Sequence, residues 1–188
     1  MKKLAVLLVA VLMAAPAFAG DKGILKLSLW GDAAVAVPNN IHTVRGIDLG
    51  IGSTTDSLYG FQWNLLFGEV GELRGINEAL AVAKVNEGYG INSAWIYART
   101  NHFYGAQGAI VSINDSFFGG LQAGLINLSH GKVIGAQFGF YNQVADLHGV
   151  QLGFVNYAQH ISKGLQIGLV NIAKNGWLPA MIIVNGRF

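Results

Sequence analysis

GLQAGLIN at residues 120–127 recurs as GAQFGFYN at 135–142, as GVQLGFVN at 149–156 and as GLQIGLVN at 164–171. Weaker copies continue the same phase toward the N-terminus, each with an amide or an aspartate two residues after its first glycine; they begin at Gly46, Gly60, Gly75, Gly90 and Gly105. Self-similarity at a fixed short period is the signature of a repeat architecture. The chain from residue 46 to residue 171 is therefore predicted to consist of one repeated unit of 14–15 residues.

Side chains alternate within each unit. In the last copy, Leu165, Ile167 and Leu169 fall on one face, and Gln166 falls with the glycines on the other. A period of two is that of a β-strand, whereas a helix would require a spacing of 3.6 residues. Charged residues and turn formers gather between the units, at residues 130–132, 146–148, 160–163 and 174–176. The pattern predicts an all-β fold with one apolar row and one row of glycines and amides.

The first residues are typical of a secretory signal peptide. Lys2 and Lys3 precede an apolar run at residues 4–13, and a small-x-small cleavage site follows at residues 17–19. We therefore expect a signal peptide at residues 1–19 and a single repeat-built β domain at residues 20–188. Cysteine is absent, so neither a disulfide framework nor a thiolate metal site is expected.

The composition is unusual for a protein surrounded by water. Only 12% of the residues are charged and 52% are hydrophobic, whereas about a quarter of the residues in soluble domains are charged. Without the leader, the Lys and Arg residues balance the Asp and Glu residues, so no basic face is expected that could bind nucleic acid. We expect the outer membrane or the cell surface as the location and outer-membrane lipid as a partner.

Two architectures fit the repeat. The first is an antiparallel transmembrane β-barrel of about 10–12 strands, because a unit of this length divides into a tilted membrane-crossing strand of about 9–11 residues and a turn. The alternative is a β-solenoid, in which each unit forms one coil, the apolar row forms the core and the amides stack into ladders on an accessible face. The residues assigned to the barrel lumen or to these ladders are Gln122, Gln137, Gln151, Gln166, Asn127, Asn142, Asn156 and Asn171.

The Gly-x-Gln-x-Gly-x-x-Asn units and the final residues 185–188, NGRF, resemble those of a family of bacterial surface-repeat proteins. The resemblance is sharp from residue 120 to residue 188, is weaker from residue 46 to residue 114, and brings no catalytic residues with it. A final strand that ends on Phe188 also looks like the signal by which outer-membrane barrels are recognised, so the barrel assembly machinery is a second expected partner.

No catalytic, metal-binding or cofactor-binding residue is expected. The five histidines lie in or near predicted turns, at spacings that match no zinc motif. A hydrolase would need a serine activated by a histidine and an acid. His130 or His148 could act with Ser129 or Asp146, but nothing in their spacing distinguishes these residues from a chance combination.

The sequence therefore favours a structural or pore-like protein of the outer membrane or cell surface without catalytic activity. A secreted or surface-attached β-solenoid binding module is the alternative.

Overall fold

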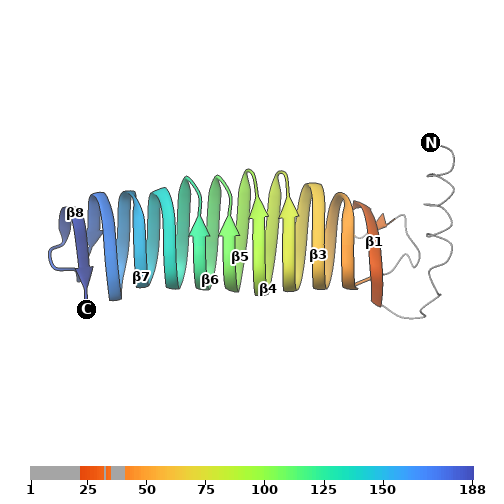
Figure 1. Cartoon of the computed structure of the whole chain (residues 1–188), viewed down its shortest axis with the longest axis horizontal. Helices are drawn as coiled ribbons and strands as arrows, with labels where there is room; N and C mark the ends of the chain where they lie inside the picture. Colours follow the sequence, from red (N-terminus) through yellow and green to blue (C-terminus); the bar gives the residue numbers. More distant parts are fainter. Residues whose placement is uncertain (1–21, 32, 35–40) are drawn as a thin grey trace.

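The protein is a stack of β-strands that wind around one long axis (Figure 1). The structure, a computed structural model, describes residues 22–31, 33–34 and 41–188. The predicted signal peptide lies outside these residues. The strands are β1 (Lys22–Trp30), β2 (Ala33–Ala34), β3 (Thr43–Ala79), β4 (Val82–Ala94), β5 (Tyr97–Gly108), β6 (Val111–Ala123), β7 (Ile126–Ala173) and β8 (Ala180–Arg187). No helix occurs among the described residues, which confirms the all-β prediction.

Successive repeats pair in parallel and in register. Gly75 lies beside Gly90 in the pairing of β3 with β4, and Gly90 lies beside Gly105 in the pairing of β4 with β5. The same register continues through Gly120 to Gly135. The longest strands, β3 and β7, exceed one repeat and wind through several coils (Figure 1).

The fold is a β-solenoid, so the expectation of an antiparallel barrel is wrong. An up-and-down barrel joins neighbouring strands by hairpins, and identical residues would then lie at alternating levels along the barrel. Parallel pairing with an offset of one repeat instead places each residue beside its own copy in the next coil. The strict phase of the motif is a consequence of this stacking.

The C-terminal end of the stack is built differently. Strand β8 pairs antiparallel with the last coil of β7, and Asn185 lies opposite Gln166. Reversal of the chain here ends the parallel winding.

One residue of β8 has an unusual backbone conformation. Ile183 has a φ of 72°, in the left-handed region that a β-branched residue rarely adopts.

Half of the interior is apolar. Side chains from successive coils form a column in which Phe103 stacks on Phe118 with ring centroids 6.1 Å apart. Val133, Leu147 and Ile161 continue the column, and all five residues are fully buried. The other half of the interior is polar, and it contains the amides of the motif.

The first glycine of the motif is required by the close approach of neighbouring coils. Gly135 has a φ of 141°, and a Cβ atom at this position would collide with the backbone carbonyl oxygen of Gly120 in the preceding coil. Glycine is the only residue that adopts this conformation without a steric penalty. The recurrence of the glycine once per coil therefore follows from the backbone geometry.

Candidate functional site

The glutamines of the motif form a buried ladder inside the solenoid. Gln137 Nε2 donates to Gln122 Oε1 at 2.7 Å, Gln151 Nε2 donates to Gln137 Oε1 at 2.7 Å, and Gln166 Nε2 donates to Gln151 Oε1 at 2.8 Å. None of these side chains is exposed to solvent. Because a buried amide without partners is costly, these bonds between neighbouring coils offset the burial of the glutamines from Gln122 to Gln166. The amide of Gln62, farther toward the N-terminus, is buried without a hydrogen-bond partner.

The asparagines form a second buried ladder whose donors point the other way along the axis. Asn127 Nδ2 donates to Asn142 Oδ1, and Asn142 Nδ2 donates to Asn156 Oδ1, both at 2.8 Å. Asn156 Nδ2 donates in turn to Asn171 Oδ1 at 2.8 Å. The second glycine of the motif makes room for this ladder, since a Cβ atom on Gly153 would collide with Asn142 Nδ2. The spacing of the motif thus reflects the contacts of the asparagine.

The glutamine ladder is part of one polar column that extends through the whole solenoid. In register with the glutamines, every coil places a polar side chain inside; the column consists of Lys26, Asp48, Gln62, Asn77, Asn92, Gln107, Gln122, Gln137, Gln151, Gln166 and Asn185. Asn77 and Asn92 replace glutamine in two of the weaker repeats, and Asn77 Nδ2 donates to Asn92 Oδ1 at 3.0 Å. The column therefore follows the phase of the motif through the weaker repeats.

The N-terminal end of this column carries charge. Asp48 is fully buried and accepts hydrogen bonds from the hydroxyl groups of Ser28, Ser53 and Thr55 at 2.9, 2.5 and 2.9 Å. Lys26 is 1% exposed, and its Nζ donates to the Thr54 carbonyl oxygen at 2.6 Å. Hydroxyl groups take the place of amides in these first coils, a role that the sequence motif does not reveal.

The amides therefore line neither a lumen nor an accessible face. The barrel reading placed the glutamines around a lumen, and the solenoid reading placed them on a surface with the apolar row as the core. The structure has the opposite arrangement, in which the amides lie inside and the apolar row points outward. Stacking at an offset of one repeat lets the amides bond to one another, so their burial is compatible with stability.

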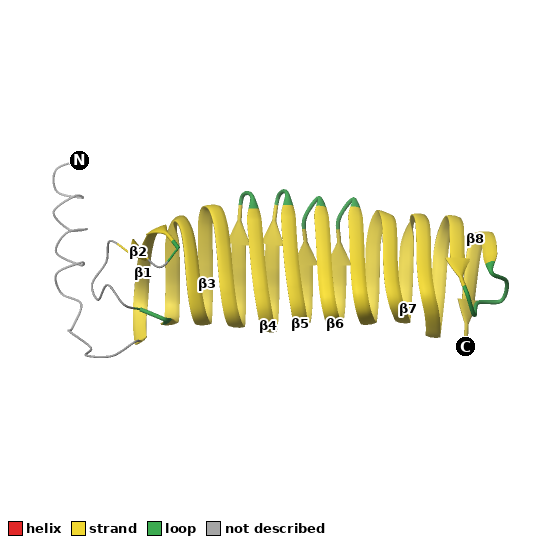
Figure 2. Ribbon diagram, turned by 180° about the vertical axis from the view of Figure 1, so that it is seen from behind, coloured by secondary structure: helices red, strands yellow, loops and turns green. Residues whose placement is uncertain are grey.

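The outward apolar row forms an exposed surface along the solenoid. The chain turns between its strands at residues 80–81, 95–96, 109–110 and 124–125, and these loops follow one edge of the solenoid (Figure 2). Large apolar side chains occupy this edge and the equivalent positions of the neighbouring coils. We define the apolar edge as Leu65, Leu66, Trp95, Ile96, Ile110, Leu125, Phe140, Phe154 and Leu169, all of which are exposed.

The apolar surface extends from the edge onto both adjoining sides of the coils. Before the turn it includes Leu121 and Phe138, each 42% exposed, and after the turn it includes Ile126. Phe140 and Phe154 stack on each other at the edge with ring centroids 4.8 Å apart. Among the described residues at the positions equivalent to Leu121, Phe138 and Leu125 in the other repeats, Glu78 is the only charged one.

Comparisons with protein-family models, with curated proteins and with solved structures gave no match. The described residues include no helix that could span a bilayer.

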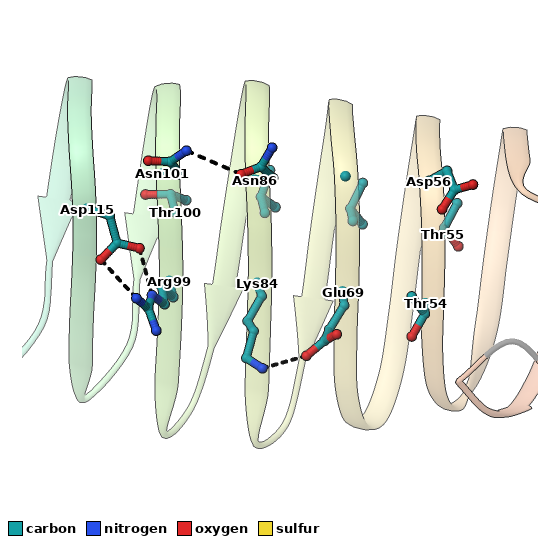
Figure 3. A pocket seen from close by; sticks show the side chains of 13 residues that line it. Thr54, Thr55, Asp56, Glu69, Lys84, Asn86, Arg99, Thr100, Asn101 and Asp115 are labelled. Atoms are coloured by element: carbon teal, nitrogen blue, oxygen red, sulfur yellow. Dashed lines mark hydrogen bonds and ion pairs between the residues drawn. The ribbon is translucent and has the colours of Figure 1, made fainter.

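A second surface feature is a shallow polar groove across strands β3–β6, with a volume of about 430 Å³ (Figure 3). Glu69 pairs with Lys84 at 2.5 Å, and Asp115 Oδ2 lies 2.7 Å from Arg99 Nε. Opposite charges on neighbouring coils thus neutralise one another within the groove. Its lining residues include no aromatic ring on which a sugar could stack.

Asp115 in this groove has a lowered pKa. Hydrogen bonds from Arg99, aided by its charge and by His130, hold the pKa of Asp115 below its ordinary value, although partial burial opposes the shift. The same hydrogen bonds and charge raise the pKa of Arg99. Because the folded-state pKa of Asp115 is lowered, the stabilisation by this pair is present at neutral pH and is lost on acidification through that pKa.

The residues considered for a hydrolase do not assemble. Ser129 is 1% exposed, and its Oγ donates to Gln122 Oε1 inside the solenoid at 2.9 Å. The next residue, His130, points outward and lies 3.5 Å from Asp115. Adjacent residues of a strand face opposite sides of the sheet, so this serine and this histidine cannot act together. Across residues 22–31, 33–34 and 41–188, no three His, Asp or Glu side chains are grouped so that they could hold a metal ion.

Phe188 follows β8 and is 76% exposed, with its ring centroid 5.9 Å from that of Trp177. Its expected recognition by the barrel assembly machinery depended on a barrel, so it has no role in the site described here.

The residues that sequence reasoning placed on the wrong side are those of the apolar edge. The signal that could have identified them is the presence of large apolar residues in the turns, where Gly, Pro, Asn, Asp and Ser are usual.

Proposed function

We propose that this chain is a non-catalytic β-solenoid module that is exported to the bacterial surface and attaches there through its apolar outer surface. The observation that carries the proposal is the outward row of large apolar side chains on consecutive coils. Exposed apolar patches larger than a few hundred Å² mark interaction sites in soluble proteins. The predicted signal peptide at residues 1–19 is consistent with a location outside the cytoplasm.

The polar interior supports this assignment. A solenoid that buried the apolar row of the motif, such as Leu121 and Leu165, would expose the amides of the motif, but here the amide ladders are buried. The exposed apolar side chains take no part in the hydrogen bonds of the amide ladders and are free to contact a partner. We do not propose conduction of solutes, because the side chains along the axis fill the interior and are closed to solvent.

Cell fractionation tests the proposal. An epitope-tagged chain should sediment with the cell envelope and should be cleaved when intact cells are treated with protease. Replacement of Phe140 and Phe154 by glutamate should shift the protein from the envelope to the soluble fraction. Retention in the cytoplasm, or an entirely soluble wild-type protein in the culture medium, would contradict the proposed function.

A further inference from the structure

We infer that the partner of the apolar edge is a phospholipid bilayer, into whose interfacial layer the edge inserts while the solenoid axis lies parallel to the membrane plane. This inference rests on the proposed attachment function and specifies its partner. It differs from a transmembrane barrel because the protein would lie on the membrane and would leave its charged side in water. Proteins that bind in this way bury an apolar face about 5–10 Å into the boundary between headgroups and acyl chains.

The shape of the apolar surface favours lipid. The surface continues around the turns of the coils, with Leu121 and Phe138 on one side of the edge and Ile126 on the other. A flat protein partner, or a second copy that packs sheet against sheet, would cover one side of the edge and leave the other exposed. A fluid acyl layer surrounds a protruding edge on both sides, so immersion covers the whole apolar surface.

The length of the edge fits a planar target. Members of the apolar edge lie on every coil from Leu65 to Leu169 except the one that turns at residues 80–81, and neighbouring strands in a sheet are about 4.8 Å apart. The loops follow a nearly straight line along the solenoid (Figure 2). A straight row of side chains can enter a flat membrane at one depth. The members include Trp95 and the stacked rings of Phe140 and Phe154, residue types that favour the interface.

The charges indicate what kind of lipid is needed. Near the edge, the cations Lys84 and Arg99 are each paired with an acid of a neighbouring coil. They therefore offer no unbalanced positive surface to anionic headgroups. Among the described residues at the outward positions of the row, Glu78 is the only charged one. Binding should thus depend on apolar burial and should not require anionic lipid or low salt.

Flotation with protein-free vesicles tests the inference. Residues 20–188 are mixed with phosphatidylcholine vesicles and centrifuged through a density gradient at low and at high salt. We expect the protein to float with the vesicles at both salt concentrations. The variant with Phe140→Glu and Phe154→Glu should bind at least tenfold less, because both charges would enter the acyl layer. Because both side chains are exposed, we expect the variant to fold, and its circular dichroism spectrum should match that of the wild type.

A matched control has the same number of new glutamates away from the edge. His148 and Gln159 are exposed on neighbouring coils, so the variant with His148→Glu and Gln159→Glu should float like the wild type. Equal loss of binding in both variants would overturn the inference. So would wild-type protein that stays at the bottom of the gradient, whether as a monomer or as a dimer.

A second readout does not depend on the glutamate variants. With the other tryptophans replaced by phenylalanine, Trp95 fluorescence should be quenched by phosphatidylcholine brominated on its acyl chains. Fluorescence that is insensitive to brominated lipid would refute insertion of the edge. If cells retain the protein at the envelope but vesicles do not bind it, the lipid inference fails while the attachment function stands.

Discussion

Replacement of Gln137 by leucine tests whether the buried amide ladder stabilises the fold. Gln137 donates to Gln122 Oε1 at 2.7 Å and to Ser129 Oγ at 3.1 Å, and it accepts from Gln151 Nε2 at 2.7 Å. Loss of these three bonds, at roughly 1 kcal/mol each, would cost about 3 kcal/mol. Burial of the leucine carbons offsets about 1 kcal/mol of that loss. The net expectation is a free energy of unfolding lower by about 2 kcal/mol.

Urea unfolding followed by circular dichroism measures this effect. With a denaturant dependence of about 2 kcal/mol per molar urea, the midpoint should fall by about 1 M. The control is Gln159→Leu, because Gln159 is exposed and its replacement should change stability by less than about 0.5 kcal/mol. An unchanged midpoint for Gln137→Leu would contradict a stabilising role of the ladder, since the ladder would then be no more stabilising than an apolar core.

Three further predictions follow from local geometry. Gly135→Ala should destabilise the fold by more than about 3 kcal/mol in the same urea assay, because Gly135 has a φ of 141° and its new Cβ atom would collide with a backbone carbonyl. The control Gly108→Ala should be neutral, because the nearest atom to its Cβ lies at 3.9 Å. Arg99→Met should raise the pKa of Asp115 toward its ordinary value in a carbon NMR titration and remove this pair's share of the loss of stability on acidification below about pH 4. Ile183→Gly should leave the unfolding midpoint unchanged or raise it, because relief of a strained φ of 72° offsets the entropy cost of glycine; a clear decrease would count against strain at this residue.

The local structure was predictable from short-range patterns. Alternation in the last copy predicted strands, and the phase of the glycines predicted the repeat from residue 46 to residue 171. Both patterns depend on neighbouring residues or on a fixed period, so a single sequence contains them. The weaker repeats were less informative, since Asn77 and Asn92 occupy the position of the glutamine and bond to each other. The phase of the glycines already placed these asparagines at the glutamine position, and the pairing of the coils shows that they are hydrogen-bonded neighbours.

The candidate surface was harder to predict than the fold class. Alternation shows that Leu121 and Gln122 face opposite ways, but it does not show which of the two faces water. In most proteins the apolar face is the buried one, so the solenoid reading placed the leucine inside. The structure buries Gln122 and leaves Leu121 42% exposed, because the amide finds its partners in the adjacent coils.

Short-range patterns in the chain establish that it forms β-strands, that these strands repeat every 14–15 residues, and which side chains share a face. The parallel stacking of the strands, the burial of the amides and the exposure of the apolar row are set by contacts between coils. These outcomes depend on which coil lies beside which. Hydrogen bonds such as that between Gln137 and Gln122 form only when residues one repeat apart in sequence become neighbours along the axis.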